Sequence, residues 1–207
     1  MNLITKVASV GSAVGIVGGA VALTNHLYKG FRDIRERLAG FGYQVLKFDG
    51  DADEWSKLDL AYKAESTSSK KFSGTVTDLK EQCKIILTRG PNDDIYNLAR
   101  RWCVKEDSIK SILERNKYTK LEKTSSKSTE RSKWEEKINA MKDAPTETIK
   151  IDIDFNTGDT NSWITALEKA CDALMEDSIK THNQDEFEKK YIQAKSWCAV
   201  KQEGSNK

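Results

Sequence analysis

The sequence predicts a mostly α-helical protein, with an N-terminal transmembrane helix followed by two related small helical units and one short strand. Three observations lead to this prediction: an uncharged apolar segment near the N-terminus, many helix formers with only two prolines, and a tandem repeat. Of the 207 residues, 38% are apolar and 32% are charged, a balance typical of a modest core under a solvated surface. The predicted organisation is a membrane anchor over residues 1–30, a first unit over 31–122, a linker over 123–133 and a second unit over 134–207.

The N-terminal segment is the predicted membrane anchor. Residues 7–28 contain no Asp, Glu, Lys or Arg, and about 20 helical residues cross the hydrocarbon of a bilayer. Gly11, Gly15 and Gly19 stand four apart, and such a stripe of small residues lets two membrane helices pack closely and self-associate. Two alternatives are a signal peptide cleaved after residues 20–22 and a buried helix.

The orientation in the membrane stays open on the sequence alone. A single lysine, Lys6, precedes the apolar segment, whereas a cluster of basic residues follows it: Lys29, Arg32, Arg35 and Arg37. The positive-inside rule would therefore hold the soluble part in the cytoplasm. The paired cysteines described below favour the opposite side.

The tandem repeat has three motifs in the same order. Trp-x5-Ala-x-Lys occurs at 55–63 and again at 134–142, and Leu-x-x-x-Cys follows at 79–83 and 167–171. The third motif, Tyr-x-x-Ala-basic-x-Trp-Cys, occupies 96–103 and 191–198. Ordered matches on rare residue types indicate a duplicated unit.

The repeated aromatic residues are predicted to be core residues. In the third motif, Tyr, Ala and Trp-Cys lie near one face of a helix with 3.6 residues per turn. A large ring beside a small residue is typical of close helix packing rather than of a binding site. The expected core anchors are Trp55, Tyr96, Trp102, Trp134, Tyr191 and Trp197.

The helices follow from periodicity and from stop signals. Gly40 and Gly90-Pro91 are expected to end helices, and the Ser/Thr/Lys-rich run 123–133 is the linker. Between 149 and 155, Ile and Phe alternate with polar residues, which predicts the short strand. Helices are expected near 28–39, 53–64, 75–89, 93–104, 107–116, 129–142, 161–175 and 184–200.

The four cysteines divide equally between the two units. Their motif positions favour the pairs Cys83–Cys103 and Cys171–Cys198 among the three pairings that four cysteines allow. In an exported domain these pairs would be disulfides. In the cytoplasm the same residues would be buried reduced thiols.

No motif predicts catalysis, a metal site or a cofactor. The chain has two histidines, His26 at the membrane boundary and His182 in a polar turn. Two acidic runs, 49–53 and 152–156, begin like a calcium loop but lack its glycine and its final glutamate. The net charge of +2 is spread evenly, so nucleic-acid binding is not expected. The protein is therefore predicted not to be an enzyme.

The combined pattern resembles a known group of proteins. A glycine-rich N-terminal segment, a basic helix and the Trp and Trp-Cys motifs together resemble the large paralogous families of uncharacterised proteins in haemotropic mycoplasmas. The resemblance covers nearly the whole chain. It implies a wall-less bacterium that lives on host red cells and a family of surface-displayed, antigenically variable proteins, and it implies no catalytic or binding residues.

Two functions follow as expectations. The first is a membrane-anchored surface protein with its soluble part outside the cell, which displays antigen or binds a host protein. The alternative is a cytoplasmic-facing membrane adaptor with reduced cysteines, held with its basic flank against anionic lipid.

Overall fold

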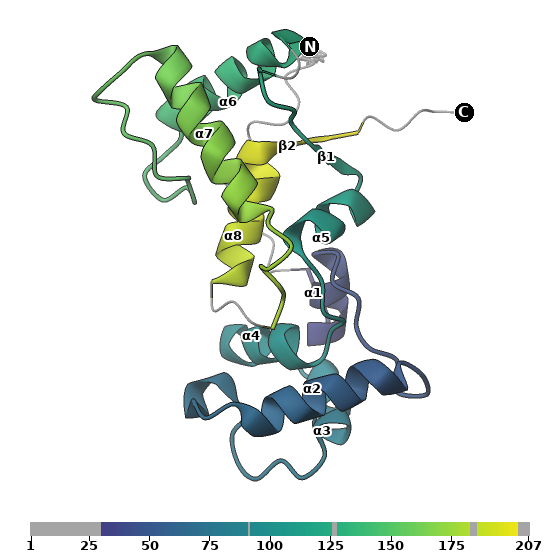
Figure 1. The fold of residues 1–207 in the computed structure, drawn as a ribbon. Helices are drawn as coiled ribbons and strands as arrows, with labels where there is room; N and C mark the ends of the chain where they lie inside the picture. Colours follow the sequence, from purple (N-terminus) through teal and green to yellow (C-terminus); the bar gives the residue numbers. More distant parts are fainter. Residues whose placement is uncertain (1–29, 91, 126–127, 183–185, 203–207) are drawn as a thin grey trace, which may run out of the picture.

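The computed structural model describes residues 30–90, 92–125, 128–182 and 186–202. These residues form an elongated stack of two helical halves, with α1 to α4 at one end and α6 to α8 at the other (Figure 1). The first half contains α1 (Ile34–Gly40), α2 (Ala52–Ala64), α3 (Leu79–Leu87) and α4 (Asp93–Trp102). The second half contains α5 (Ile109–Arg115), β1 (Tyr118–Lys120), α6 (Arg131–Asp143), α7 (Thr160–Leu174), α8 (Phe187–Gln193) and β2 (Ala199–Lys201). Short 3₁₀ helices at Ser68–Lys70 and Ser128–Glu130, and a π-helical turn at Ala194–Cys198, complete the described elements.

The protein is mostly helical, as predicted. The predicted fold class was wrong, however, in including a transmembrane helix. Within the described ranges, no helix is both long and apolar enough to cross a bilayer. The longest of them, α7, has 15 residues, or roughly 22 Å at 1.5 Å per residue against a hydrocarbon layer of about 30 Å. The segment 1–29, with Gly11, Gly15, Gly19 and the alternative cleavage site, lies outside the described residues.

Side-chain caps set the helix starts more sharply than periodicity does. The carboxylate of Asp78 accepts the backbone N–H of Glu81 at 3.1 Å, so α3 begins at Leu79 rather than near residue 75. At the start of α7, Asp159 and Ser162 form a reciprocal capping box. These caps satisfy backbone donors that the first helical turn leaves unpaired.

The predicted strand at 149–155 is wrong, because no described strand pairs with that stretch. Its carbonyls accept side-chain donors instead: the indole N–H of Trp197 donates to Ile149 at 2.8 Å, and the amide of Gln193 donates to Lys150 at 2.6 Å. The alternation of apolar and polar residues reflects burial of one side of an irregular segment. The described sheet pairs β1 with β2 antiparallel, with Thr119 opposite Val200.

The repeat extends to the helix and turn that precede each tryptophan motif. α1 and α5 correspond at one constant offset in numbering, each followed by a residue with positive φ, Gly42 at 87° and Lys117 at 63°. A side chain at Gly42 would also clash with Asn116. Equivalent main-chain bonds then join Leu46 to Cys103 at 3.1 Å and Leu121 to Cys198 at 2.9 Å. This correspondence groups α5 with the second half, whereas the sequence prediction placed residues 107–116 in the first unit.

Two tryptophans in each half anchor loops in the same way. In α2 the indole N–H of Trp55 donates to the carbonyl of Lys47 at 2.9 Å, and in α6 that of Trp134 donates to Glu122 at 2.8 Å. At the end of α4, Trp102 donates to the Lys70 carbonyl at 2.6 Å, the counterpart of the bond that Trp197 makes to Ile149. The matched bonds show that both halves share one local architecture.

The halves also share one hydrophobic core. Tyr43, which follows α1, lies with its ring 6.2 Å from that of Phe187 and 6.3 Å from that of Tyr191, both in α8. A polar contact joins the halves as well: Arg115, at the end of α5, donates to the carbonyl of Gly42 at 2.7 Å. Apolar and polar contacts therefore both cross the junction.

Candidate functional site

The structure places all six predicted aromatic anchors and all four cysteines in the core. The aromatic anchors are between 1% and 7% exposed, and all four cysteines are fully buried. The anchors are Trp55, Tyr96, Trp102, Trp134, Tyr191 and Trp197. Their rings pack in the core, and the four indoles also donate to the carbonyls described above, so these residues organise the scaffold.

The cysteines form one disulfide in each half. Cys83 of α3 is bonded to Cys103 at the end of α4, with Cα atoms 5.6 Å apart. Cys171 of α7 is bonded to Cys198, with Cα atoms 5.4 Å apart. Both separations lie in the usual disulfide range, and this is the pairing that the repeat favours.

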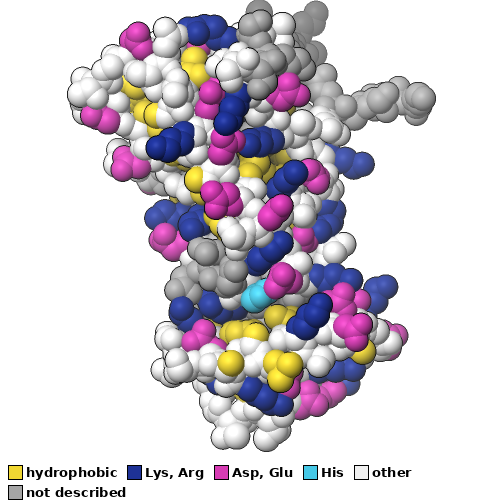
Figure 2. Space-filling model, in the orientation of Figure 1, with side chains coloured by type: hydrophobic (Ala, Val, Ile, Leu, Met, Phe, Trp, Pro, Cys, Tyr) yellow, Lys and Arg dark blue, Asp and Glu magenta, His cyan; other side chains and the backbone are white. Residues whose placement is uncertain are grey.

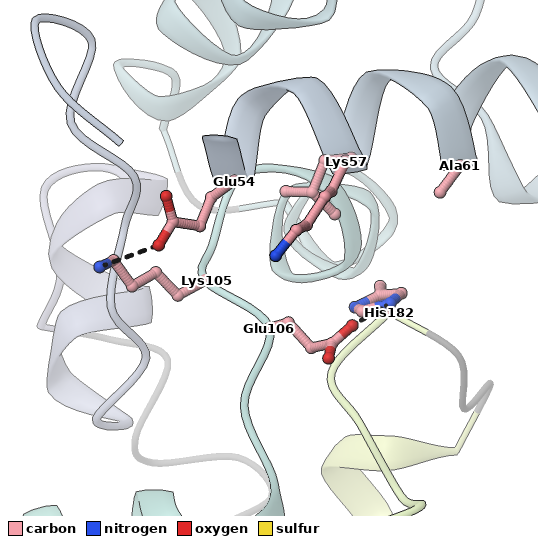
Figure 3. Close-up of a pocket in the computed structure, with 7 residues that line it drawn as sticks. Glu54, Lys57, Ala61, Lys105, Glu106 and His182 are labelled. Carbon is pink, nitrogen blue, oxygen red and sulfur yellow. Dashed lines mark ion pairs between the residues drawn. The ribbon is translucent and has the colours of Figure 1, made fainter. Parts of the chain in front are cut away.

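A cleft at the junction of the halves is the candidate site (Figure 3). It has a volume of about 230 Å³ and lies between α2, the segment at Lys105 and Glu106, and the turn at His182. Leu58 and Ala61 of α2 form its apolar floor. Glu54, Lys57, Lys105, Glu106 and His182 supply its polar wall.

A clamp between the halves holds His182 in this cleft. The preceding residue, Thr181, is fully buried, and its N–H donates to the carbonyl of Asp107 at 3.0 Å. Arg100 of α4 donates to the Thr181 carbonyl at 2.7 Å. These bonds fix Thr181, in the loop after α7, against Arg100 and Asp107. His182 is the next residue, so its imidazole is held in the cleft.

The imidazole of His182 faces the carboxylate of Glu106. Its Nε2 lies 2.7 Å from Glu106 Oε2, and the side chain is only 19% exposed. Burial lowers the pKa of His182 below its ordinary value, although the Glu106 charge acts in the opposite direction. In the neutral ring the shared proton sits on Nε2, so the buried Nδ1 is an acceptor, and it has no partner within the described ranges.

The other end of the cleft carries a paired lysine. Lys105 Nζ lies 3.2 Å from the Asp51 carboxylate and 3.5 Å from that of Glu54. A backbone hydrogen bond from Lys47 is the main cause that lowers the pKa of Asp51, and Lys105 adds to it. Lys57, by contrast, extends from α2 toward the 105–106 segment (Figure 3) and forms no ion pair with any described residue.

The cleft combines a Glu–His pair with two lysines and an apolar surface. A Glu–His pair can hold or move a proton, and the described residues that line the cleft include no Ser, Thr or Cys. No group of His, Cys, Asp or Glu in the described part of the chain is arranged to hold a metal ion, and this includes both acidic runs considered from the sequence. The cleft therefore offers an apolar floor between charged groups.

Sequence reasoning interpreted His182 as an ordinary surface residue and passed over Glu106 and Lys57. No local signal marks the three residues, because they lie on segments that are far apart in the chain. Comparisons with protein-family models, curated proteins and solved structures return no match for this chain. The site therefore has to be interpreted from its own geometry.

Proposed function

We propose that this protein is an exported, surface-displayed interaction protein that binds a host protein and presents variable antigen. The two halves, each closed by its own disulfide, serve as a rigid scaffold, and the exposed polar residues on this scaffold change without loss of the fold. The observation that carries the proposal is the pair of disulfides, Cys83–Cys103 and Cys171–Cys198.

The disulfides support export because of where such bonds persist. They form in oxidising compartments and are rare in a reducing cytoplasm. Here every described cysteine is paired and none is free. The resemblance to paralogous families of haemotropic mycoplasmas points in the same direction, since it implies surface display.

The test is a thiol-accessibility experiment on intact cells that express the full chain. A membrane-impermeant reductant is applied, followed by an impermeant maleimide, and the mass shift of the protein is measured before and after lysis. Because the four cysteines are fully buried, digestion of intact cells with an added protease serves as a second readout that does not depend on thiol exposure.

The two outcomes separate the two functions. Labelling of intact cells only after reduction, together with digestion by the external protease, supports surface display. Labelling only after lysis, without a need for reductant, would contradict the proposal and favour the cytoplasmic-facing adaptor with reduced cysteines.

A further inference from the structure

Two lysines of the second half lie on one surface with Tyr118 of β1. The ammonium nitrogen of Lys195, in the π-helical turn, lies 5.2 Å from the centre of the Tyr118 ring and 5.9 Å from that of Tyr191. Lys201 of β2 is the antiparallel partner of Tyr118. Side chains that are paired across two strands point to the same face of a sheet. We call the surface formed by Tyr118, Lys195 and Lys201 the Tyr118 surface.

The positive charge of this surface is not balanced by a carboxylate of the described chain. Figure 2 shows basic and acidic side chains intermixed over the face in view, but Lys195 and Lys201 form no ion pair with any described residue. The Asp172 carboxylate nearby is already shared by Lys120 and Lys123. Burial lowers the pKa of Lys195, and the positive charge of Lys201 lowers that pKa further, as expected of two neighbouring amines.

The equivalent position of the first half shows what kind of group meets this cation. The repeat aligns Lys195 with Arg100, and the offset that relates α5 to α1 aligns Tyr118 with Tyr43. Arg100 donates to the carbonyl of Thr181 at 2.7 Å, and Tyr43 is only 4% exposed beneath the other half. In the second half the aligned lysine and tyrosine are half-buried, and no described residue accepts a hydrogen bond from the lysine. The position thus receives an oxygen acceptor from outside its own half in one unit and lacks a described acceptor in the other.

We propose that the Tyr118 surface binds the phosphate group of a phosphate monoester, with its oxygens accepting hydrogen bonds from Lys195 and Lys201. A phosphate monoester carries nearly two negative charges at neutral pH, which match the two ammonium groups, and lysine binds phosphate as a point charge. A single carboxylate would leave one of the two amines without a counter-charge. This binding does not depend on the proposed display of the protein at a cell surface.

The experiment titrates the purified full chain, with both disulfides intact and its lysines ¹³C-methylated, which keeps their charge. The probe is glycerol 3-phosphate, and acetate at equal ionic strength is the control anion. NMR signals of Lys195 and Lys201, each identified by its absence from a variant, are followed. Saturable shifts of both signals are expected with glycerol 3-phosphate, and binding of acetate should be about tenfold weaker.

Two variants locate the binding. K195M keeps an apolar side chain over the aromatic rings, and K201Q changes an exposed position. Each should weaken binding of glycerol 3-phosphate about tenfold, because one charge-assisted contact is lost. The matched control is K57Q, a lysine that also lacks an ion pair among the described residues but lies on α2 of the other half. It should leave binding unchanged. Without ligand, K201Q and K57Q should melt within a few degrees of wild type, so K201Q tests the site even if K195M is less stable.

A second probe identifies the source of the phosphate. Dihexanoyl phosphatidic acid, kept below its micelle concentration, carries the phosphate of glycerol 3-phosphate on an acylated glycerol. Tighter binding of this lipid than of glycerol 3-phosphate would indicate a lipid headgroup, and equal binding would indicate a free phosphate monoester.

Three results would overturn the inference: no saturable shift with either phosphate probe, binding of acetate as tight as that of glycerol 3-phosphate, or an equal effect of K201Q and K57Q. Each concerns the purified protein only. A failure here would therefore leave the cell-surface experiment to decide the proposed function separately.

Discussion

Indole N–H groups fix loops to helices across separations of 8 to 48 residues in the chain. Each of Trp55, Trp102, Trp134 and Trp197 donates to a main-chain carbonyl between 2.6 and 2.9 Å away. A buried indole needs such a partner, and a buried carbonyl needs a donor. One residue type thus supplies both apolar contact area and the hydrogen bond that fixes a loop against a helix.

Replacement of Trp197 by Phe tests the contribution of this bond. The ring is largely kept, but the Ile149 carbonyl loses its indole donor, so the free energy of unfolding should fall by about 1–3 kcal/mol. Urea denaturation followed by circular dichroism measures the change. The control is W163F, whose bond to Thr157 lies at the exposed surface, where water can replace the donor. An equal loss in both variants would argue against a special role for the buried bond.

His182 should make the stability of the protein depend on pH, and the direction of this dependence follows from the pKa shift. Because burial lowers its pKa in the folded state, the unfolded chain takes up a proton first as the pH falls below about 6.5. Stability should therefore be complete above that pH and decline below it, until the pH passes the folded pKa.

The pH prediction is measured as a difference between two proteins. Glu188 contributes with the opposite sign at lower pH, since burial raises its pKa, and other carboxylates also titrate there. The free energies of unfolding of wild type and H182N should be compared from pH 7.5 to pH 5, and the wild type should lose more. Parallel profiles would show that the imidazole does not titrate differently on folding.

Each half contains helices too short to be stable alone. The described helices have between 7 and 15 residues, and isolated helices of this length are marginal in water. A disulfide joins α3 to the end of α4 in the first half, and another joins α7 to the turn after α8 in the second. The covalent link restricts the unfolded chain and compensates for a modest core.

Removal of either disulfide should destabilise the protein by a similar amount. The bonds span 20 and 27 residues, and loops of this size correspond to about 3 kcal/mol each in the chain-entropy description. The double variants C83S/C103S and C171S/C198S should therefore both show lower melting temperatures. A loss confined to one of them would mean that the halves do not depend on their bonds equally.

The whole molecule depends on a junction that buries polar as well as apolar groups. Arg100 is only 3% exposed, donates to the Thr181 carbonyl and lies 5.5 Å from the centre of the Phe187 ring. Its charge also lowers the pKa of Glu188 in α8, against the larger effect of burial. One arginine of the first half thereby holds both the turn that carries His182 and the start of α8.

Arg100→Met should loosen this junction. The Thr181 carbonyl would lose its donor, and the buried Glu188 carboxylate would lose one of the two arginine charges that lower its pKa. The free energy of unfolding should therefore fall by about 2–4 kcal/mol. Relative to wild type, amide hydrogen exchange in the variant should accelerate more in α8 than in α2. R100K keeps the charge and should recover part of the loss. Uniform exchange throughout the chain would contradict a local effect.

Local patterns in the sequence account for the helical class, the order of the helices and the cysteine pairing that the structure adopts. They also pointed to the aromatic residues that the core buries. Local patterns failed at 149–155, where alternation predicted a strand. Alternation reports one-sided burial, and it cannot show whether a neighbouring strand is present to accept the hydrogen bonds.

Residue type and periodicity therefore predicted the burial of the aromatic anchors and the cysteines and most of the helical segments, because these signals act over a few neighbouring positions. The three-dimensional fold was needed to reveal the correspondence of α5 with α1, the pairing of β1 with β2, and the contact of Glu106 with His182 beside Lys57. These features depend on packing between segments far apart in the chain. The energy of a contact between distant segments depends on how close they lie in three dimensions, and a pattern of neighbouring residues does not contain that information.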